Sequence, residues 1–528
     1  MIKNPCEEGM ALGRRAARQG SPYGAWILAT TILGSSMAFI DGTVVTVVLP
    51  VLQNTFRATV AQVQWIIESY ALLLAALILL GGSLGDRFGR RRVYVIGTVI
   101  FSAASVLCGL STDVHQLIVS RAIQGIGGAL LIPGSLSIIS ASFNEEDRGR
   151  AIGTWSGFTA ITAAVGPVLG GWLVEHGSRR WVFFINVPLA VVVVGLASFR
   201  VPESREEEAD TALDWPGALL ATLALGLVVF GLIESSARGW GHPGVFGTCL
   251  AGLFFLAAFL AWEGYSRAPM VPLGLFRSGN FSGANAVTLF LYTALTGALF
   301  FLPFNLIQIQ GYSPTAAGAS LLPIIVIMFL LSRWTGGLVH QYGSRLPLVV
   351  GPLIAALGFA LFALPNAGGS YWDTFFLPAC VLGLGMAVSV APLTTTVMGA
   401  AGKEKAGVAS GINNAISRVG GLLAVALFGI ILANVFGAHL DEKLRGLDAD
   451  HEVRRSISEQ KTKLAAITLP SGTAPLLAAR IRQEISESYV AGFRWVMATS
   501  AFLSVLSSLS SWLMIGPKER GRDRCSRS

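Results

Sequence analysis

The chain has 528 residues, of which 53% are hydrophobic and only 13% are charged, and its mean hydropathy is +0.63. Soluble domains carry roughly 25% charged residues, so this composition excludes an ordinary soluble enzyme or binding domain. A net charge of +8 is compatible with nucleic-acid binding. The basic residues lie between apolar runs, however, where membrane orientation explains them better.

Apolar runs long enough to cross a membrane follow one another along the chain. A bilayer core requires roughly 20 apolar residues per helix. The first run follows about two dozen residues and lacks a convincing cleavage site, which favours a retained span over a signal peptide. The thirteenth run is too long for one straight span, so its ends are expected to project or kink. The fourteen predicted spans are about 25–49, 61–84, 93–110, 114–138, 149–174, 181–201, 214–234, 244–264, 279–307, 315–339, 346–364, 372–398, 406–438 and 490–515.

The distribution of arginine and lysine predicts the orientation. With the N-terminus in the cytoplasm, the cytoplasmic segments hold Arg14, Arg15, Arg18, Arg87, Arg90, Arg91, Arg92, Arg148, Arg150, Lys403, Lys405 and the tail from Lys518 to Arg527. The short outer loops hold only Arg57, Arg179, Arg180 and Arg238. This bias places both termini in the cytoplasm. Because arginine outnumbers lysine, we expect a GC-rich bacterium and its plasma membrane.

An internal repeat predicts two halves. The stretch from Gly82 to Arg91 and the stretch from Gly336 to Arg345 share two glycines, a leucine and the final arginine in register. Eight spans separate the copies, which fits two six-helix halves with two inserted helices and a binding cavity between the halves. The predicted parts are a cytoplasmic N-terminus 1–24, a first bundle 25–201, a linker with two inserted helices 202–278, a second bundle 279–515 with a polar extracytoplasmic loop 439–489, and a cytoplasmic tail 516–528.

Several stretches resemble one transporter family. Gly82 to Arg92 is similar to the signature loop of the major facilitator superfamily. Asp41 to Pro50 (DGTVVTVVLP) and Arg121 to Gly128 (RAIQGIGG) resemble first-helix and fourth-helix motifs of its fourteen-helix drug:proton antiporter branch, the EmrB/QacA-like proteins. Gly166 to Gly171 (GPVLGG) matches the fifth-helix antiporter motif of that branch.

Two further stretches, Trp181 to Pro188 and Gly311 to Gly318, resemble the same branch. The resemblance implies an all-α membrane protein with the major facilitator fold, two six-helix bundles and two inserted helices. The second loop departs from the pattern because His340 and Gln341 replace the acid and arginine of the first copy. The last six spans also hold no acid near the middle of the membrane, so coupling is expected in the first half.

Three ionisable residues are expected at one depth in the first half. Asp41, Glu68 and Arg121 lie seven or eight residues from the outer ends of their spans, roughly 10–12 Å below the surface. Charged groups at that depth cost several kcal/mol and indicate function. We expect Asp41 to be the principal proton and cation site, Arg121 to tune it, and Glu68 to be an auxiliary acid. The alternatives are structural. Asp41 could serve only in the packing of helices, and Glu68 could only pair with Arg121 or face a water pocket on the outer side. Arg121 could be a structural anchor for helix ends.

Two motifs are expected to serve conformational change. By resemblance, Gly82, Asp86, Arg87, Gly89 and Arg90 form a cytoplasmic gate in which the acid and arginine pair in one conformation only. The alternative is a solvated loop, and for Arg91 and Arg92 that alternative is favoured.

In the fifth span, Pro167 removes a helix hydrogen bond and allows a bend. Gly166, Gly170 and Gly171 allow close packing, and the family associates this motif with antiport. Any bent membrane helix could carry such a motif. Arg333 and Arg418 are assigned to structure, as side chains that reach the membrane surface.

The sequence therefore predicts a proton-coupled secondary exporter, a drug:H+ antiporter that acts by alternating access on amphiphilic compounds, with cations favoured. It predicts no enzyme activity, no metal and no cofactor other than the proton gradient. The expected partners are a small amphiphilic substrate, protons and the lipid bilayer, without nucleic acid, and a periplasmic adaptor is left open. Three alternatives remain: a proton symporter that imports a small nutrient, an exporter of one metabolite or antibiotic, and a sensor without transport.

Overall fold

The computed structural model describes residues 22–205, 214–266, 269–401, 406–445, 450–470 and 473–517, and these form helices joined by short loops. The predicted cytoplasmic charges at Arg14, Arg15, Arg18, Lys403, Lys405 and 518–527 lie outside these residues. The side chains of Arg148, Arg150, Arg333 and His340 also lie outside the description.

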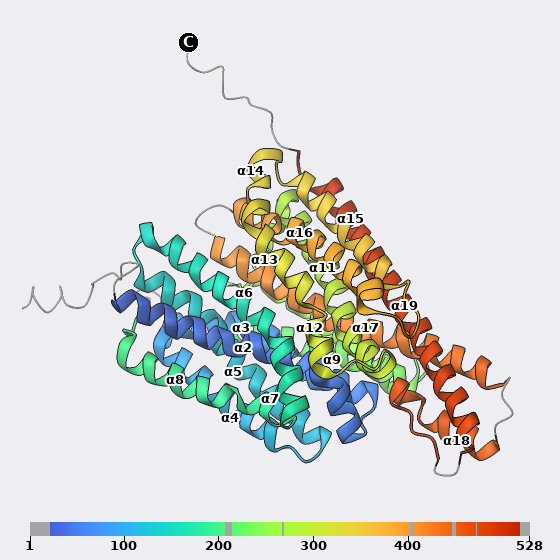
Figure 1. The fold of residues 1–528 in the computed structure, drawn as a ribbon. Coiled ribbons are helices and arrows are strands. Elements are labelled where there is room, and N and C mark those ends of the chain that lie inside the picture. Colours follow the sequence, from blue (N-terminus) through green and yellow to red (C-terminus); the bar gives the residue numbers. More distant parts are fainter. Residues whose placement is uncertain are drawn as a thin grey trace, which may run out of the picture.

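The helices fall into three groups along the chain (Figure 1). The first half contains α2 (Pro22–Phe56), α3 (Val60–Phe88), α4 (Arg90–Leu110), α5 (Val114–Ser142), α6 (Glu145–His176), α7 (Trp181–Phe184) and α8 (Asn186–Arg200). The inserted pair is α9 (Trp215–Arg238) and α10 (Pro243–Tyr265). The second half contains η1 (Leu273–Arg277), α11 (Gly279–Phe304), η2 (Asn305–Ile309), α12 (Pro314–Ala319), α13 (Leu322–Gly336), α14 (Leu338–Tyr342), α15 (Arg345–Phe362), η3 (Trp372–Phe376), α16 (Leu377–Ala401), α17 (Ala406–Arg445), α18 (His451–Glu459), η4 (Lys461–Ala466) and α19 (Pro475–Met514).

The membrane-crossing helices follow the predicted spans. Within the described residues, 13 helical segments are long and apolar enough to cross a membrane, and each overlaps one of the predicted spans. The remaining predicted span, 149–174, lies within α6, a helix of 32 residues that packs against α2 and α12. The chain is thus an all-α, multi-pass membrane protein.

The two copies of the internal repeat have matching backbone geometry. Gly89, which ends α3, has φ of 112°, and Gly343, which ends α14, has φ of 78°. Few residues other than glycine adopt such angles. Arg91 donates to the Val201 carbonyl, and the equivalent Arg345 donates to the Trp512 carbonyl. In each half, the loop arginine therefore anchors the end of the last helix of its own bundle.

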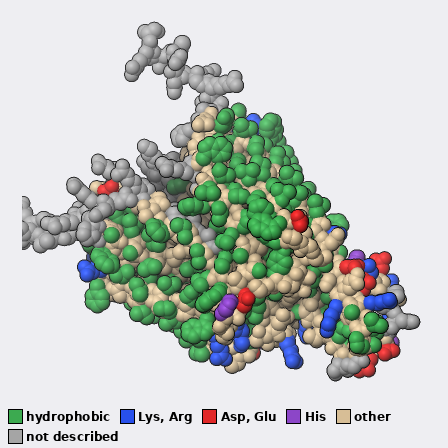
Figure 2. Space-filling view, in the orientation of Figure 1, with side chains coloured by type: hydrophobic (Ala, Val, Ile, Leu, Met, Phe, Trp, Pro, Cys, Tyr) green, Lys and Arg blue, Asp and Glu red, His purple; other side chains and the backbone are tan. Residues whose placement is uncertain are grey.

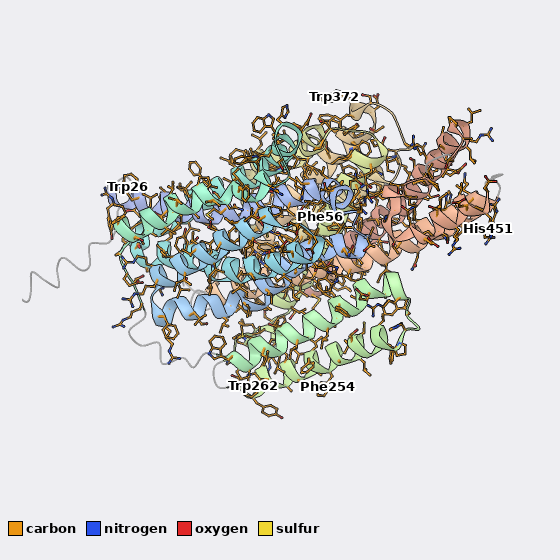
Figure 3. All side chains as sticks on the ribbon, turned by 90° about the horizontal axis from the view of Figure 1, so that it is seen from below. Trp26, Phe56, Phe254, Trp262, Trp372 and His451 are labelled. Carbon is orange, nitrogen blue, oxygen red and sulfur yellow. The ribbon has the colours of Figure 1, made fainter. Side chains whose placement is uncertain are left out.

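The segment between the last two spans differs from the predicted polar loop. Helices α17 and α19 have 40 residues each, about 60 Å at 1.5 Å per residue, twice the thickness of a bilayer core. Their far ends, with α18 and η4, form a protrusion (the hairpin), which His451 marks in Figure 3. The apolar core of the body continues into the hairpin, where Leu440, Leu444, Val453, Ile457, Ile481 and Ile485 are buried.

Helix α19 begins at Pro475, before the predicted span 490–515, so the last part of the predicted loop 439–489 is helical. Figure 2 shows charged side chains gathered on the hairpin, whereas apolar side chains cover most of the visible face of the body.

The inserted pair lies at the side of the molecule (Figure 3). Helix α9 packs against α3 and α17, one from each half, and α10 packs on α9. Phe254 and Trp262 of α10 are exposed at 67% and 40%, as expected of side chains that face lipid.

The two halves converge at one end of the molecule and diverge toward the other (Figure 1). The end where they converge carries the hairpin and is called the hairpin end. The opposite end, where α2 begins and α19 finishes, is called the termini end. The largest core cluster joins residues of both halves with the hairpin, from Val44 in α2 to Phe428 in α17. A second cluster lies entirely in the first half, and a third lies entirely in the second half. The described halves thus share their main apolar core at the hairpin end.

Candidate functional site

A buried ion pair connects the first and fourth membrane helices of the first half. Asp41 on α2 and Arg121 on α5 are both 0% exposed, and Arg121 Nη1 lies 2.5 Å from Asp41 Oδ2. The other carboxylate oxygen, Oδ1, accepts from Gln124 Nε2 at 2.8 Å and from Asn186 Nδ2 at 3.3 Å. Both oxygens of this acid therefore accept hydrogen bonds from buried donors.

The pair belongs to a wider polar network. Ser105 on α4 accepts from Gln124 and Asn186 and donates to the Phe183 carbonyl. Asn186 is the first residue of α8, directly after the helix break at Ile185. The network thus ties together α2, α4, α5 and the α7–α8 break.

Arg121 also contacts α3. Its Nε donates to the Ile66 carbonyl at 3.1 Å, and its guanidinium lies 4.2 Å from the centre of the Tyr70 ring. Its second terminal nitrogen, Nη2, has no hydrogen-bond partner among the described residues. A cation–π contact with Tyr70 and hydrogen bonds to Ile66, Asp41 and Gln124 fix the position of this side chain.

Glu68 does not join this network. It is 1% exposed, and its Oε2 has no hydrogen-bond partner among the described residues. No ion pair or hydrogen bond joins Glu68 to Asp41 or Arg121 among the described residues, and its role as an auxiliary acid stays a prediction. Ile66 and Tyr70 face α5, and at about 100° per residue Glu68 points to the opposite side of α3.

Four members of the site were not predicted from the sequence: Gln124, Asn186, Ser105 and Tyr70. Gln124 lies one turn after Arg121 within the fourth-helix motif, and Asn186 lies in the Trp181 to Pro188 motif. Both were visible as polar residues inside apolar spans. Ser105 and Tyr70 gave no separate signal.

The fifth-helix motif forms part of the interface between the halves. A Cβ atom on Gly171 would overlap the Pro314 carbonyl of α12, and a Cβ on Gly318 of α12 would overlap the Pro167 carbonyl of α6. Two motifs that lie about 145 residues apart in the sequence therefore pack backbone against backbone. Only glycine permits this contact.

The same motif also packs within the first half. A Cβ on Gly166 would meet Thr43, and one on Gly170 would lie 2.7 Å from Val44, both on α2. Since Asp41 is on that helix, α6 connects the buried ion pair to the interface between the halves.

Polar contacts close the hairpin end. Glu175 at the end of α6 accepts from the Thr315 backbone N–H of α12 at 3.3 Å. Gln53 of α2 accepts from Gln308 of η2 and donates to the Lys463 carbonyl of η4. One first-half side chain thus contacts both the second half and the hairpin.

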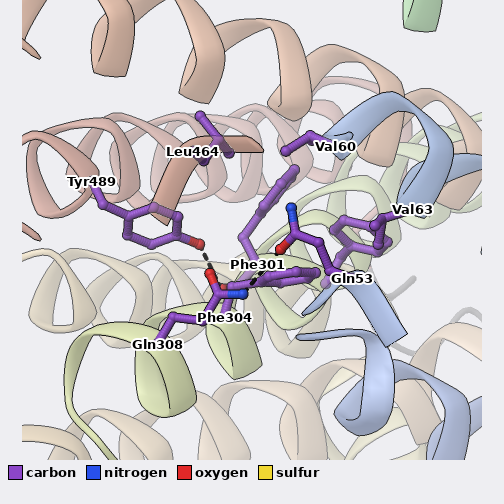
Figure 4. A pocket seen from close by; sticks show the side chains of 9 residues that line it. Gln53, Val60, Val63, Phe301, Phe304, Gln308, Leu464 and Tyr489 are labelled. Atoms are coloured by element: carbon purple, nitrogen blue, oxygen red, sulfur yellow. Dashed lines mark hydrogen bonds between the residues drawn. The ribbon is translucent and has the colours of Figure 1, made fainter. Parts of the chain in front are cut away.

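A small pocket lies beside these contacts (Figure 4). Tyr489 of α19 donates to the Phe301 carbonyl at its wall. The pocket is lined by Gln53, Val60, Val63, Phe300, Phe301, Phe304, Gln308, Leu464 and Tyr489. It is enclosed by both halves and the hairpin, away from the Asp41–Arg121 pair.

The predicted gate residues lie at the termini end. Asp86 accepts from Arg90 Nε at 2.7 Å, within the same loop. A Cβ atom on Gly82 would lie 3.7 Å from Pro133 of α5, an ordinary contact distance. Arg87 lies over the ring of Phe88, its neighbour in the chain.

The segment after α8 joins this loop. Glu203 accepts from the Arg91 backbone N–H, and its Oε2 lies 3.5 Å from the side chains of both Arg91 and Arg92. The assignment of Arg91 to charge bias alone was wrong, because it also holds Val201 and Glu203. Sequence gave no signal for Glu203. Among the described residues, no group of three His, Cys, Asp or Glu side chains is placed to hold a metal ion.

These features define the class: two related helical halves, an inserted helix pair and a buried polar network make this a polytopic membrane transporter. A family model described as the Major Facilitator Superfamily matches residues 31–425. The chain belongs to that superfamily, whose members are transporters and not enzymes.

Comparison with individual proteins shows which members of the superfamily this chain is similar to. The chain is 31% identical over 507 residues to the tetracenomycin C resistance and export protein of Streptomyces glaucescens, covering 95% of this chain and 93% of that one. It is 33% identical over 433 residues to the multidrug resistance protein Stp of Mycobacterium tuberculosis, covering 82% and 80%. A solved bacterial homologue of the human lysosomal transporter Spinster matches with a TM-score of 0.64 at 19% identity, covering 93% and 98%, which supports the fold alone.

Proposed function

We propose that this protein exports antibiotic-like amphiphilic compounds across the bacterial plasma membrane in exchange for protons. The relatives named for resistance and export support the direction of transport. The proposed orientation places the termini end in the cytoplasm and the hairpin outside. Arg87, Arg90, Arg91 and Arg92 then face the cytoplasm, in agreement with the charge bias of membrane proteins.

Alternating access follows from the way the halves meet. The shared core and the Gly171–Pro314 contact close the hairpin end in this conformation. Rocking one half against the other would separate these surfaces and bring the termini end together. The loop from Gly82 to Arg90 lies where that second closure would occur, and the Asp86–Arg90 pair is available to change partners there.

The observation that carries the proton proposal is the difference between the two buried acids. Asp41 has donors on both oxygens, so its role is to fix α2 against α5 and α8. Glu68 has a buried oxygen without a partner among the described residues, and it lies one turn from Gln64, which contacts the second half. We assign Glu68 as the proton carrier and Asp41 with Arg121 as its structural support, which reverses the ranking expected from sequence.

Export in everted vesicles tests the proposal. Wild-type vesicles with an inside-acid gradient should accumulate a transported fluorescent compound, and a protonophore should abolish accumulation. Glu68→Gln should lose gradient-driven accumulation at least 10-fold yet keep exchange of labelled for unlabelled compound. Accumulation that is insensitive to the protonophore would refute proton coupling.

The alternatives give distinct results. A proton symporter for a nutrient would drive its substrate in the direction of proton flow. A narrow-substrate exporter would move one compound of a panel and no others, and a protein without transport would move none. The relatives include a multidrug resistance protein and an exporter named for one antibiotic, so their names support a multidrug exporter and a narrow-substrate exporter equally.

A further inference from the structure

The side-chain amide of Gln64 on α3 binds the backbone of α17, a helix of the second half. Its Nε2 donates to the Val425 carbonyl at 2.6 Å, and Gln64 is fully buried. A Cβ atom on Gly429, one turn farther along α17, would overlap this nitrogen. The glycine therefore leaves the room through which the amide reaches the other half.

The other end of the same amide has no partner. Gln64 Oε1 is a buried acceptor without a hydrogen bond among the described residues, and so is Oε2 of Glu68, one helical turn away. Side chains four residues apart are neighbours on a helix, and a helical side chain leans toward the N-terminus. Glu68 thus leans toward Gln64, and two acceptors without a donor belong to neighbouring side chains.

A single proton satisfies both acceptors. A carboxyl group that carries a proton becomes a donor, so neutral Glu68 can donate to the amide oxygen of Gln64. Buried acceptors are rarely left without a donor in native proteins. These two therefore indicate a place that a proton completes.

The two ends of the amide make Gln64 sensitive to that proton. An amide has one donor end and one acceptor end. Protonated Glu68 attracts the oxygen and leaves the nitrogen on the Val425 carbonyl. Ionised Glu68 offers only acceptors and attracts the nitrogen, which turns the amide oxygen toward the Val425 carbonyl. Two acceptor oxygens repel each other, so the contact between the halves weakens.

The rest of the surface around Glu68 is apolar. Glu68 lies on the stripe of α3 that carries Trp65 and Leu72, which pack in one cluster with Val229 of α9 and Leu422 of α17. Along this stripe, Gln64 is the polar neighbour of Glu68.

The other charged groups near α3 are paired with each other or interact elsewhere. They are Glu234 with Arg238 on α9, Arg418 of α17 with Tyr70, Asp41 with Arg121 on the side of α3 that faces α5, and Lys461 with Asp441 in the hairpin. Among the described residues, Gln64 is therefore the polar group placed to respond to a proton on Glu68.

We propose that Gln64 couples a proton on Glu68 to closure of the hairpin end. Protonated Glu68 donates to Gln64 Oε1, which keeps the amide nitrogen on the Val425 carbonyl and holds α3 against α17. Loss of the proton turns the amide and releases α17. Gln64 is thus a positioning residue that acts through Glu68. This inference rests on the proposed function, in which Glu68 carries the proton, and adds the residue that converts protonation into movement.

The direction of the coupling agrees with antiport. A proton that arrives from outside favours the closed hairpin end, the conformation in which the halves diverge toward the cytoplasm. Release of that proton into the cytoplasm weakens the closed contact and allows the hairpin end to open again. The proton thus moves inward while the substrate uses the opposite movement.

The distance across the hairpin end at different pH tests the coupling. In a background without the five native cysteines, spin labels are placed at Thr112→Cys in the first half and at Ala367→Cys in the second. Both positions are exposed in loops at the hairpin end. Double electron–electron resonance is measured on the purified full chain in detergent, without gradient or substrate. Between about pH 9 and about pH 5, we expect the ratio of short to long distances to rise at least 10-fold.

The variants separate coupling from simple support. Gln64→Leu should reduce the pH-dependent change to less than about 2-fold. Gln53→Leu, the matched control, removes another hydrogen bond between the halves, the one to Gln308. It should shift the ratio at every pH and retain the 10-fold dependence.

Two further variants keep the test valid if Gln64→Leu fails to fold. Glu68→Gln offers Gln64 a donor that does not titrate, so the short distance should dominate at every pH. Gly429→Ala places a methyl group where the Gln64 nitrogen lies, and should lose the pH dependence.

Unchanged pH dependence in Gln64→Leu would overturn the proposal, as would its loss in Gln53→Leu as well. Wild-type distances that ignore pH would refute the coupling even if export were sensitive to a protonophore, and the exporter would stand. A Gln64-dependent response to pH in a protein whose export ignores the protonophore would refute proton-driven export and leave the coupling standing.

Discussion

At the scale of single residues, the Asp41–Arg121 pair is a structural element inside the membrane. Replacing Asp41 by Asn would leave the Arg121 charge uncompensated in a buried site, and removing one partner of such a pair costs about 3–5 kcal/mol. We expect Asp41→Asn to lower the thermal unfolding temperature in detergent, and the double variant with Arg121→Met to recover part of the loss. Asp373→Asn, at an exposed acid, serves as the control. Unchanged unfolding of Asp41→Asn would show that the pair contributes no stability.

The same residues show how far a sequence can locate a site. Counting residues from the span ends placed Asp41 and Arg121 at one level, and their ion pair agrees with that, because helix rise per residue is constant. Depth does not give the direction in which a side chain points, and Glu68 was grouped with the pair for that reason. The direction follows only from the packing of α3 on α5 through Ile66 and Tyr70.

At the scale of helices, the contact between α6 and α12 depends on two glycines. An added methyl group at Gly171 would overlap the Pro314 carbonyl and force the halves apart. We expect Gly171→Ala to lower export at least 10-fold and to raise the labelling of cysteines placed at the hairpin end. Gly153→Ala on the same helix adds a methyl group that meets nothing within 4 Å, so it should transport normally. Normal transport by Gly171→Ala would show that the contact is not needed for closure.

Helix positions were predicted well from hydropathy, since lipid requires long apolar helices and leaves few alternatives. The hairpin was not, because charged residues there face water and mask the apolar positions. Val453 and Ile457, spaced four apart, and Ile481 and Ile485, spaced likewise, extend the apolar core into the hairpin, a pattern that composition averages hide.

At the scale of the whole molecule, transport requires the hairpin end to open and close. Glu175 of α6 and Thr315 of α12 meet there, across the two halves. A disulfide between cysteines at these two positions would hold that end shut. In a background without the five native cysteines, the pair Glu175→Cys and Thr315→Cys should lose export on oxidation and regain it on reduction.

The crosslink also separates movement from binding. A protein locked at the hairpin end should still bind a compound offered from the termini end, because the lock leaves that end free to move. Each single cysteine variant should be insensitive to oxidation, which controls for damage by the oxidant. If the crosslinked protein exported at the wild-type rate, the two halves would not need to part at α6 and α12, and alternating access through this contact would be refuted.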